Sequence, residues 1–373
     1  MAELTIARLL FATTASVHYL FVATTLGLTP IIAVLSTLSA LRGRRQPTPI
    51  IDLLARIYVA NYGIGIVAGL VMELQMAMLW TGPGTDEYGP IAGLLALETV
   101  VAFFLESTLL GVWLAGRKII PLWLQSAVFW GITITAYASM IFIVTANSYL
   151  HDPIPTPQLT PAAFWALVDR PATVWPLIHI AASSLIIGAF WCATFGANWL
   201  RTDPLSVPGR RLIRIGVGIA ALASPPLAVA GFAQFDAARP EGVPTDEPDW
   251  LHALASVMIL TGMAIWLLTW FVLGPLTLNG AIFRGKRWLA LLRIGLWVPM
   301  PILLIGWIYR ELSRQPWFIV GRVTVQEAAS PIGTPAMLTL AAVFAVLSAV
   351  TLAVAWLVFR RVLRGHPTTV VAS

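Results

Sequence analysis

Nine long apolar segments constrain the fold of this chain more than any other feature. A helix needs roughly 20 apolar residues to cross a hydrocarbon core of about 30 Å. The segments that meet this length run over about 8–40, 52–80, 92–115, 121–146, 173–200, 211–235, 250–276, 288–309 and 334–362. They lack the alternation of a transmembrane barrel, and only 11% of all residues are charged. We therefore predict an all-α integral membrane protein, with residues 1–373 forming a single transmembrane domain.

The basic residues indicate how these helices are oriented. Lys and Arg favour cytoplasmic loops, and in a nine-helix arrangement the basic clusters share one side: Arg42, Arg44, Arg45 and Arg56; Arg117 and Lys118; Arg201, Arg210, Arg211 and Arg214; Arg284, Lys286, Arg287 and Arg293; Arg360, Arg361 and Arg364. This places the N-terminus outside and the C-terminus in the cytoplasm. The first segment is too long for a cleavable signal peptide and is expected to remain as a helix. The net charge of +6 therefore reflects topology, and no nucleic-acid partner is expected.

Ionisable side chains lie inside the apolar segments at His18, Glu98, Glu106 and His179. Such groups are costly at membrane depth and mark functional sites by default. A His and a Met on facing helices can hold a low-spin haem, whereas a lone His leaves one face of the iron open. His179 with Met258 suits the first role, and His18 suits the second. The residues alone leave an alternative open, because a membrane histidine is often hydrogen-bonded to a neighbouring helix and a methionine often only packs.

Glu98 and Glu106 are separated by eight residues in the third segment. In a regular α-helix this spacing corresponds to ~12 Å along the axis and leaves the side chains about 80° apart around it. The two carboxylates could pass protons along one side of the helix. The alternative is that each pairs with a buried polar group.

Five sequence blocks carry a resemblance to a known family. They are ARLLFATTASVHYLFVATTLG, NYGIGIVAGLVMELQ, LETVVAFFLEST, the set VTANSYLHDP, WPLIHIAASSLIIGA and SVMILTGM, and finally GWIYRELSRQPW. In order and content they resemble subunit I of the cytochrome bd quinol oxidases over nearly the whole chain. The third block, which contains both glutamates, is the most specific.

The resemblance implies a site, residue by residue. His18 matches a high-spin haem ligand, and His179 with Met258 matches the ligand pair of the low-spin haem b. Glu98 and Glu106 match glutamates beside the high-spin haems and on the proton route. The other matches to cofactor-binding positions are Arg8, Glu73, Gln75, Asn147, Arg314, Gln315 and Trp317.

Arg314 and Gln315 would hold haem propionates, because a guanidinium fork matches a carboxylate. The alternative is an ordinary interfacial anchor, with Trp317 in an aromatic belt. His252 is expected at the interface, as a propionate partner or a spare ligand. His151 and His366 are expected to be exposed and without a chemical role.

The resemblance also implies a function and partners. A subunit of this family passes electrons from an external donor through a low-spin haem to one or two high-spin haems of type b or d. There O2 is reduced to water with protons from the cytoplasmic side. The subunit pairs with a second subunit of similar helical fold, often with small single-helix proteins. We therefore expect a multi-pass protein of the bacterial cytoplasmic (inner) membrane.

One departure from the family pattern concerns the second high-spin haem. Counting back from the RQPW motif, the family's second haem glutamate falls on Leu304 and a nearby tryptophan on Met300. Leucine cannot ligate iron. Either another residue holds this haem, with Met300 or Glu98 as candidates, or its iron has no protein ligand, or the haem is missing.

Another departure concerns the electron donor. The connection from Phe235 to Trp250 is only about fifteen residues long, much shorter than the family's quinol-binding loop, and Ser256 replaces a usual arginine. The donor is expected to be quinol or a cytochrome c. An acidic cluster could steer a basic donor: Asp246, Glu247 and Asp249.

Two other classes of protein stay open, namely an electron-relay cytochrome without O2 reduction and a haemless structural paralogue in a heteromeric complex.

Overall fold

The computed structural model describes residues 2–82, 85–155, 158–237 and 249–364. Within these residues, nine helical segments are long and apolar enough to cross a membrane. This confirms the prediction of an all-α membrane protein. Helices suit such segments because lipid offers no hydrogen-bond partner for unpaired backbone groups.

The spans follow one another along the chain with short connections. They are α1 (Ala2–Leu41), α2 (Pro49–Leu79), α3 (Thr85–Thr99) continued by η1 (Val100–Glu106) and α4 (Ser107–Gly116), α5 (Leu122–His151), α7 (Pro171–Thr202), α8 (Val207–Ala237), α9 (Asp249–Leu268) continued by η2 (Thr269–Leu273) and α10 (Gly274–Leu278), α11 (Lys286–Ile294) continued by η4 (Gly295–Trp297) and α12 (Pro299–Leu312), and α14 (Thr334–Arg364). The shorter elements are α6 (Pro161–Val168), η3 (Ala281–Phe283), β1 (Trp317–Ile319), β2 (Val323–Thr324) and α13 (Val325–Ala328).

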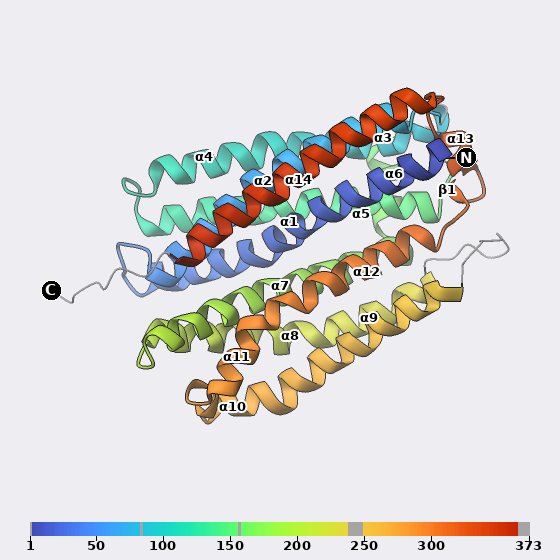
Figure 1. The fold of residues 1–373 in the computed structure, drawn as a ribbon. Coiled ribbons are helices and arrows are strands. Elements are labelled where there is room, and N and C mark those ends of the chain that lie inside the picture. The colour runs from blue at the N-terminus through green and yellow to red at the C-terminus, as the bar shows by residue number, and fades with distance from the viewer. Residues whose placement is uncertain (1, 83–84, 156–157, 238–248, 365–373) are drawn as a thin grey trace.

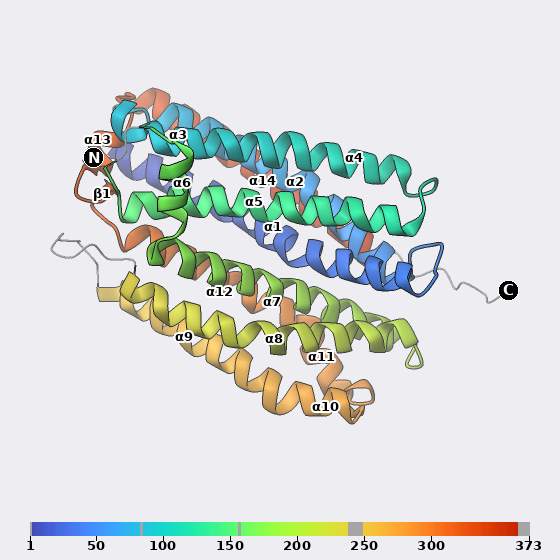
Figure 2. The same cartoon turned by 180° about the vertical axis from the view of Figure 1, so that it is seen from behind.

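The spans form two groups that lie side by side (Figures 1 and 2). One group contains α1, α2, α5 and the chain from α3 to α4, with α14 packed on α1 and α2. The other contains α7, α8, the chain from α9 to α10, and the chain from α11 to α12. Helix α1 contacts α7 and joins the two groups.

Successive spans alternate in direction, so the connections gather at two ends of the molecule (Figure 1). We call the end with the connections 42–48, 117–121, 203–206 and 279–285 the basic end, because the predicted basic clusters lie at or near it. The opposite, capped end carries α6, the two strands and α13. The positive-inside rule predicts that the basic end faces the cytoplasm.

A small hairpin closes the capped end. Strands β1 and β2 are antiparallel, with Ile319 opposite Val323, and Gly321 takes a positive φ of 71° in the turn. The backbone N–H of Val320 donates to the carbonyl of Leu150 at 2.9 Å and so ties the hairpin to the end of α5. Next to it, hydrogen bonds from the backbone and side chain of Thr324 lower the pKa of the Glu327 carboxyl.

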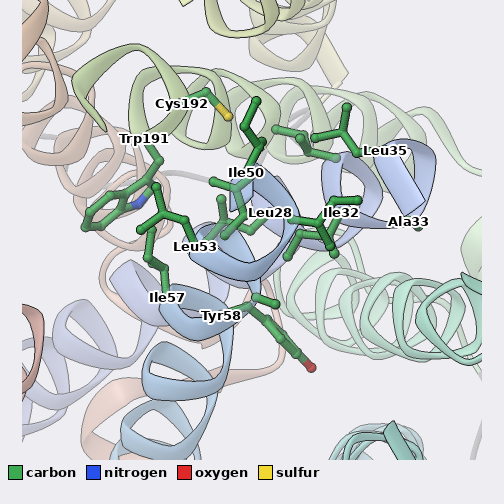
Figure 3. Close-up of a cluster of buried hydrophobic side chains, with 14 of the residues drawn as sticks. Leu28, Ile32, Ala33, Leu35, Ile50, Leu53, Ile57, Tyr58, Trp191 and Cys192 are labelled. Atoms are coloured by element: carbon green, nitrogen blue, oxygen red, sulfur yellow. The ribbon is translucent and has the colours of Figure 1, made fainter. Parts of the chain in front are cut away.

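The tightest helix contact joins α1 to α7. Gly27 and Gly188 face each other there, and a Cβ on Gly27 would meet the backbone carbonyl of Ser184 and lie 2.8 Å from the backbone nitrogen of Gly188. Small residues allow membrane helices to approach this closely. On the basic side of this contact, a buried apolar cluster that includes Leu28, Ile32 and Trp191 packs between α1, α2 and α7 (Figure 3).

The third span is not a regular α-helix. Residues Val100–Glu106 form a π-helix, an element that is rare, usually short and often found at functional sites. The 80° offset predicted for Glu98 and Glu106 assumed an unbroken α-helix and is therefore wrong. The wider turns of the π-helix change the angular advance per residue between the two carboxylates.

Candidate haem site

His18 lies on α1 with its ring against α2. Its Nδ1 is 3.0 Å from the backbone carbonyl oxygen of Gly65. A carbonyl oxygen can only accept a hydrogen bond, so Nδ1 must carry the proton. The other ring nitrogen, Nε2, then keeps its lone pair and is suited to binding a metal ion.

His179 repeats this arrangement in the other helix group. It lies on α7, and its Nδ1 is 3.1 Å from the backbone carbonyl oxygen of Leu227 on α8. The same argument assigns the proton to Nδ1 and the lone pair to Nε2.

The two histidines lie at the same level along their helices. Helices α1 and α7 both run from the capped end to the basic end. His18 precedes Gly27 by nine residues, and His179 precedes Gly188 by nine residues. Each ring therefore lies about 13.5 Å from the glycine contact, on the side of the capped end.

Met258 lies on α9, next to α12. Its Sδ is close to Gly306, where a Cβ would lie 2.9 Å from the sulfur. Helix α9 packs against α8 and α12, and both of these also contact α7, which carries His179. The predicted ligand pair therefore belongs to two helices of one group, α7 and α9, which share α8 and α12 as neighbours.

Two of the predicted carboxylates are each bound by a hydroxyl group from a neighbouring helix. Glu106 is 3% exposed and accepts a hydrogen bond from the Tyr58 hydroxyl of α2 at 2.8 Å. Glu98 accepts a hydrogen bond from Ser139 of α5 at 3.0 Å. Both acids thus have polar partners, as the alternative interpretation of the sequence predicted.

The predicted residues of α2 and the start of α1 lie nearer the capped end. Glu73 accepts a hydrogen bond from Thr99 at 3.1 Å. Gln75 is fully buried and accepts from Thr14 at 2.6 Å, while its Nε2 has no partner within the described part of the chain. Arg8 is exposed.

A partly buried polar network joins α5 to α12 at the capped end. Asn147 donates to Glu311 at 2.7 Å and accepts from Arg310 at 2.5 Å. Arg314 forms an ion pair with the other carboxylate oxygen of Glu311 at 2.5 Å. Asn147 and Arg314, which were predicted separately, thus meet through one carboxylate.

His151 belongs to the same network, and its predicted exposure is wrong. Its side chain is 1% exposed, with Nδ1 at 2.9 Å from the carbonyl oxygen of Asn147 and Nε2 at 2.9 Å from that of Arg310. Helix α5 runs through residue 151, five residues beyond the end expected for this span, so the ring packs against α12. His366 lies outside the described residues.

The remaining predicted residues lie around this network. Gln315 donates to the backbone carbonyl of Glu311 at 3.4 Å, and Trp317 begins β1. His252 is exposed, as expected for an interfacial residue. Met300 packs against the apolar cluster that lies between α1, α2 and α7. Of the acidic cluster, Asp246 and Glu247 lie outside the described residues.

The residues present fit a haem on two observations. Each histidine offers Nε2 as a metal ligand, because Nδ1 is occupied by a carbonyl. Arg314 is 8% exposed, and its Nε and Nη1 have no partner within the described residues. Buried guanidinium donors are normally paired, and a propionate carboxylate would satisfy this pair.

Sequence reasoning missed Tyr58, Arg310 and Glu311 as parts of the site. Tyr58 lies three residues before the second sequence block, and tyrosine in an apolar helix usually indicates packing or an interface. Arg310 and Glu311 were in the fifth block, but their connection to Asn147 depends on the contact between α5 and α12. These features together define an all-α, multi-span membrane protein with buried histidine, carboxylate and guanidinium groups.

The comparisons identify the family. The chain matches the cytochrome bd terminal oxidase subunit I family over residues 6–240 and 229–367, and it belongs to this family. It is similar to cytochrome bd ubiquinol oxidase subunit 1 of Bacillus subtilis (strain 168), with 28% identity over 201 residues, or 53% of this chain and 43% of the relative. It is also similar to cytochrome bd-II ubiquinol oxidase subunit 1 of Escherichia coli (strain K12), with 28% identity over 202 residues, or 52% of this chain and 39% of the relative.

These matches span less than half the length of either relative. Among solved structures, the bd oxidase from Geobacillus thermodenitrificans superimposes with a TM-score of 0.78 and 20% sequence identity, covering 96% of this chain and 98% of that chain. The two chains therefore share the fold.

Proposed function

We propose that this chain is the haem-binding subunit of a cytochrome bd-like terminal oxidase in the bacterial cytoplasmic membrane. The observation that carries the proposal is the pair of histidines, each with Nδ1 bound to a backbone carbonyl and Nε2 available. Both lie in a chain of the cytochrome bd subunit I family. The reaction is the reduction of O2 to water with electrons from an external donor.

His179 and Met258 would hold a low-spin haem b, and His18 would hold a high-spin haem. Bound haems would supply electron transfer and a site for O2. The backbone carbonyls of Gly65 and Leu227 orient the imidazole rings and make Nε2 a better donor to a metal. Arg314 would bind a propionate with the two guanidinium nitrogens that lack partners.

The ligand of a second high-spin haem is proposed among three residues. Leu304 cannot serve, and the sequence named Met300 and Glu98. The structure adds Glu311, which lies seven residues after Leu304 on the same helix face and holds both carboxylate oxygens in fixed positions through Asn147 and Arg314. Each of these oxygens has a second lone pair that could bind a metal.

We infer that Glu106 and Glu98 hold and move protons taken up from the basic end. Three aromatic rings pack on one another on the basic side of Glu106: Phe129 contacts Tyr58 and Trp113, with ring centroids 5.6 and 5.2 Å apart. The Tyr58 hydroxyl is the polar group that reaches Glu106 from this aromatic layer. It therefore fixes where the carboxyl group points.

Tyr58→Phe should slow O2 reduction by roughly tenfold, because Glu106 loses a hydrogen bond worth about 1.5 kcal/mol. The infrared band of the Glu106 carboxyl should shift in the same variant. Tyr137→Phe is the matched control, because the Tyr137 hydroxyl binds the carbonyl of Leu26 and not a carboxylate. Equal turnover and equal carboxyl bands in the two variants would show that Tyr58 does not act on Glu106.

The donor and the partner subunits follow from the family and are part of the proposal. Quinol or a cytochrome c would deliver electrons at the capped end, near the end of α8 and the start of α9; the connection between them, 238–248, lies outside the described residues. A second subunit of similar helical fold, with or without small single-helix proteins, would pack against the lipid-facing helices. Helix α14 is a candidate surface, since most of its side chains are exposed.

A reduced-minus-oxidised absorption spectrum with quantitative haem extraction tests the function on the purified complex. We expect a low-spin b haem together with one or two high-spin haems, and O2 uptake with an artificial donor. Haem without O2 uptake would instead support an electron relay, and a colourless protein would support a haemless paralogue.

Glu311→Gln should lower the content of high-spin haem, because the substitution removes the carboxylate proposed as an iron ligand. An unchanged content of high-spin haem would leave Met300 and Glu98 as the candidate ligands.

A further inference from the structure

We propose that Gly69 and Gly231 are positioning residues for the two histidine iron ligands, each forming a notch that holds one imidazole ring. The proposal rests on the proposed function, in which His18 and His179 bind haem iron. Neither glycine stood out in the sequence, because both lie in apolar helical segments without a charged neighbour.

The first notch lies on α2. His18 donates from Nδ1 to the carbonyl of Gly65, and Gly69 follows that carbonyl by four residues, one helical turn on the same face. A Cβ on Gly69 would lie 2.9 Å from Cε1 of His18 and 3.3 Å from Nδ1. The first of these distances is shorter than a Cβ can tolerate, so alanine at this position would displace the ring.

The second notch lies on α8 and has the same construction. His179 donates from Nδ1 to the carbonyl of Leu227, and Gly231 again follows by four residues. A Cβ on Gly231 would lie 3.1 Å from both Cε1 and Nδ1 of His179. The same pair of features, a carbonyl and then a glycine one turn later, thus holds both histidines in separate helix groups.

Glycine in a helix interior is unfavourable relative to alanine, so a packing reason is expected where it occurs. Other glycines of the same two helices show that the notch is specific. Gly63 on α2 and Gly218 on α8 have no atom within 4 Å of the place where a Cβ would lie. Gly65 on α2 faces Phe21, and Gly209 and Gly216 on α8 pack against α7. On these two helices, Gly69 and Gly231 are therefore the glycines at which a Cβ would meet an imidazole ring.

The chemistry follows from which edge of the ring is held. The carbonyl fixes Nδ1, and the glycine allows the Nδ1–Cε1 edge to lie against the helix. Nε2 is then the nitrogen that remains for iron. The direction in which Nε2 points is set by the position of the Nδ1–Cε1 edge. A hydrogen bond at the second nitrogen of a metal-binding histidine fixes the tautomer and orientation of the ring, so a displaced edge would tilt Nε2 away from its metal.

The test uses four variants of the whole complex: Gly69→Ala and Gly231→Ala, with Gly63→Ala and Gly218→Ala as matched controls on the same helices. Low-temperature electron paramagnetic resonance separates high-spin from low-spin ferric haem without any need for turnover. We expect Gly69→Ala to lose or shift the high-spin signal of the His18 haem and to keep the low-spin signal. Gly231→Ala should shift the low-spin signal alone, and the two controls should match the unmodified protein.

Each haem serves as the internal reference for the other. The proposal is overturned if Gly69→Ala and Gly231→Ala give the same spectra as their controls. Loss of both signals together in either variant would also overturn it, because a notch acts on one ring only. If the unmodified protein contains no haem, the proposed function is wrong. If it contains haem but neither glycine variant changes the signals, only the proposal for the two glycines is wrong.

Discussion

His18→Ala should abolish O2 reduction and leave the low-spin haem spectrum intact. The imidazole of His18 is the ligand proposed for a high-spin haem, and its ring lies on α1 in contact with α2. His179 lies on α7 in contact with α8, so the substitution touches none of the helix contacts of that ring. The measurement is O2 uptake with an artificial donor, together with the reduced-minus-oxidised spectrum of the same preparation.

His179→Ala gives the reciprocal expectation, namely loss of the low-spin band and of electron entry from the external donor. Each variant is the control for the other, because His18 and His179 lie in different helix groups and bind different carbonyls. Unchanged O2 uptake in His18→Ala would refute the assignment of the high-spin ligand. A low-spin band that persists in His179→Ala would refute the His179–Met258 pair.

The sequence predicts the membrane spans well, and it singles out polar side chains inside them as candidates for the site. Long apolar segments have few structural solutions in lipid, and His18, Glu98 and His179 are recognisable because polar groups are rare at that depth. Each of them has a hydrogen-bond partner on another helix in the structure. The resemblance added Met258 and the capped-end residues, which composition and spacing alone do not identify.

Other features depend on packing that a linear pattern does not contain. The π-helix around Glu106 falls in a stretch whose residues also suit an α-helix. His151 was predicted to be exposed because it follows the apolar segment, but α5 continues through it and α12 covers it. The hydroxyl of Tyr58 reaches Glu106 only because α2 packs beside the third span. These contacts join residues that are far apart in the sequence, and the pattern of apolar residues along the chain does not predict them.

Gly188→Val should prevent assembly of the folded protein. A side chain at this position would meet the backbone carbonyl of Gly27, and backbone on both sides of the contact cannot move as a flexible side chain does. Overpacking in a close-packed core typically lowers the stability of the fold by about 1–3 kcal/mol and occasionally by more. A clash with backbone atoms should cause a loss at the upper end of this range. We expect little folded protein after solubilisation, measured by size-exclusion chromatography and thermal unfolding.

Gly111→Val is the matched control, because Gly111 lies in the α4 segment of the third span and a Cβ there would meet no atom within 4 Å. Both variants place the same β-branched residue in a helix, so their difference reports the α1–α7 contact alone. His18 and His179 are carried by these two helices, each nine residues from the contact. Any folded Gly188→Val protein should therefore show both haem signals changed together, in contrast to the selective effects expected at Gly69 and Gly231. Equal stability of Gly188→Val and Gly111→Val would contradict the close approach of the two helix groups.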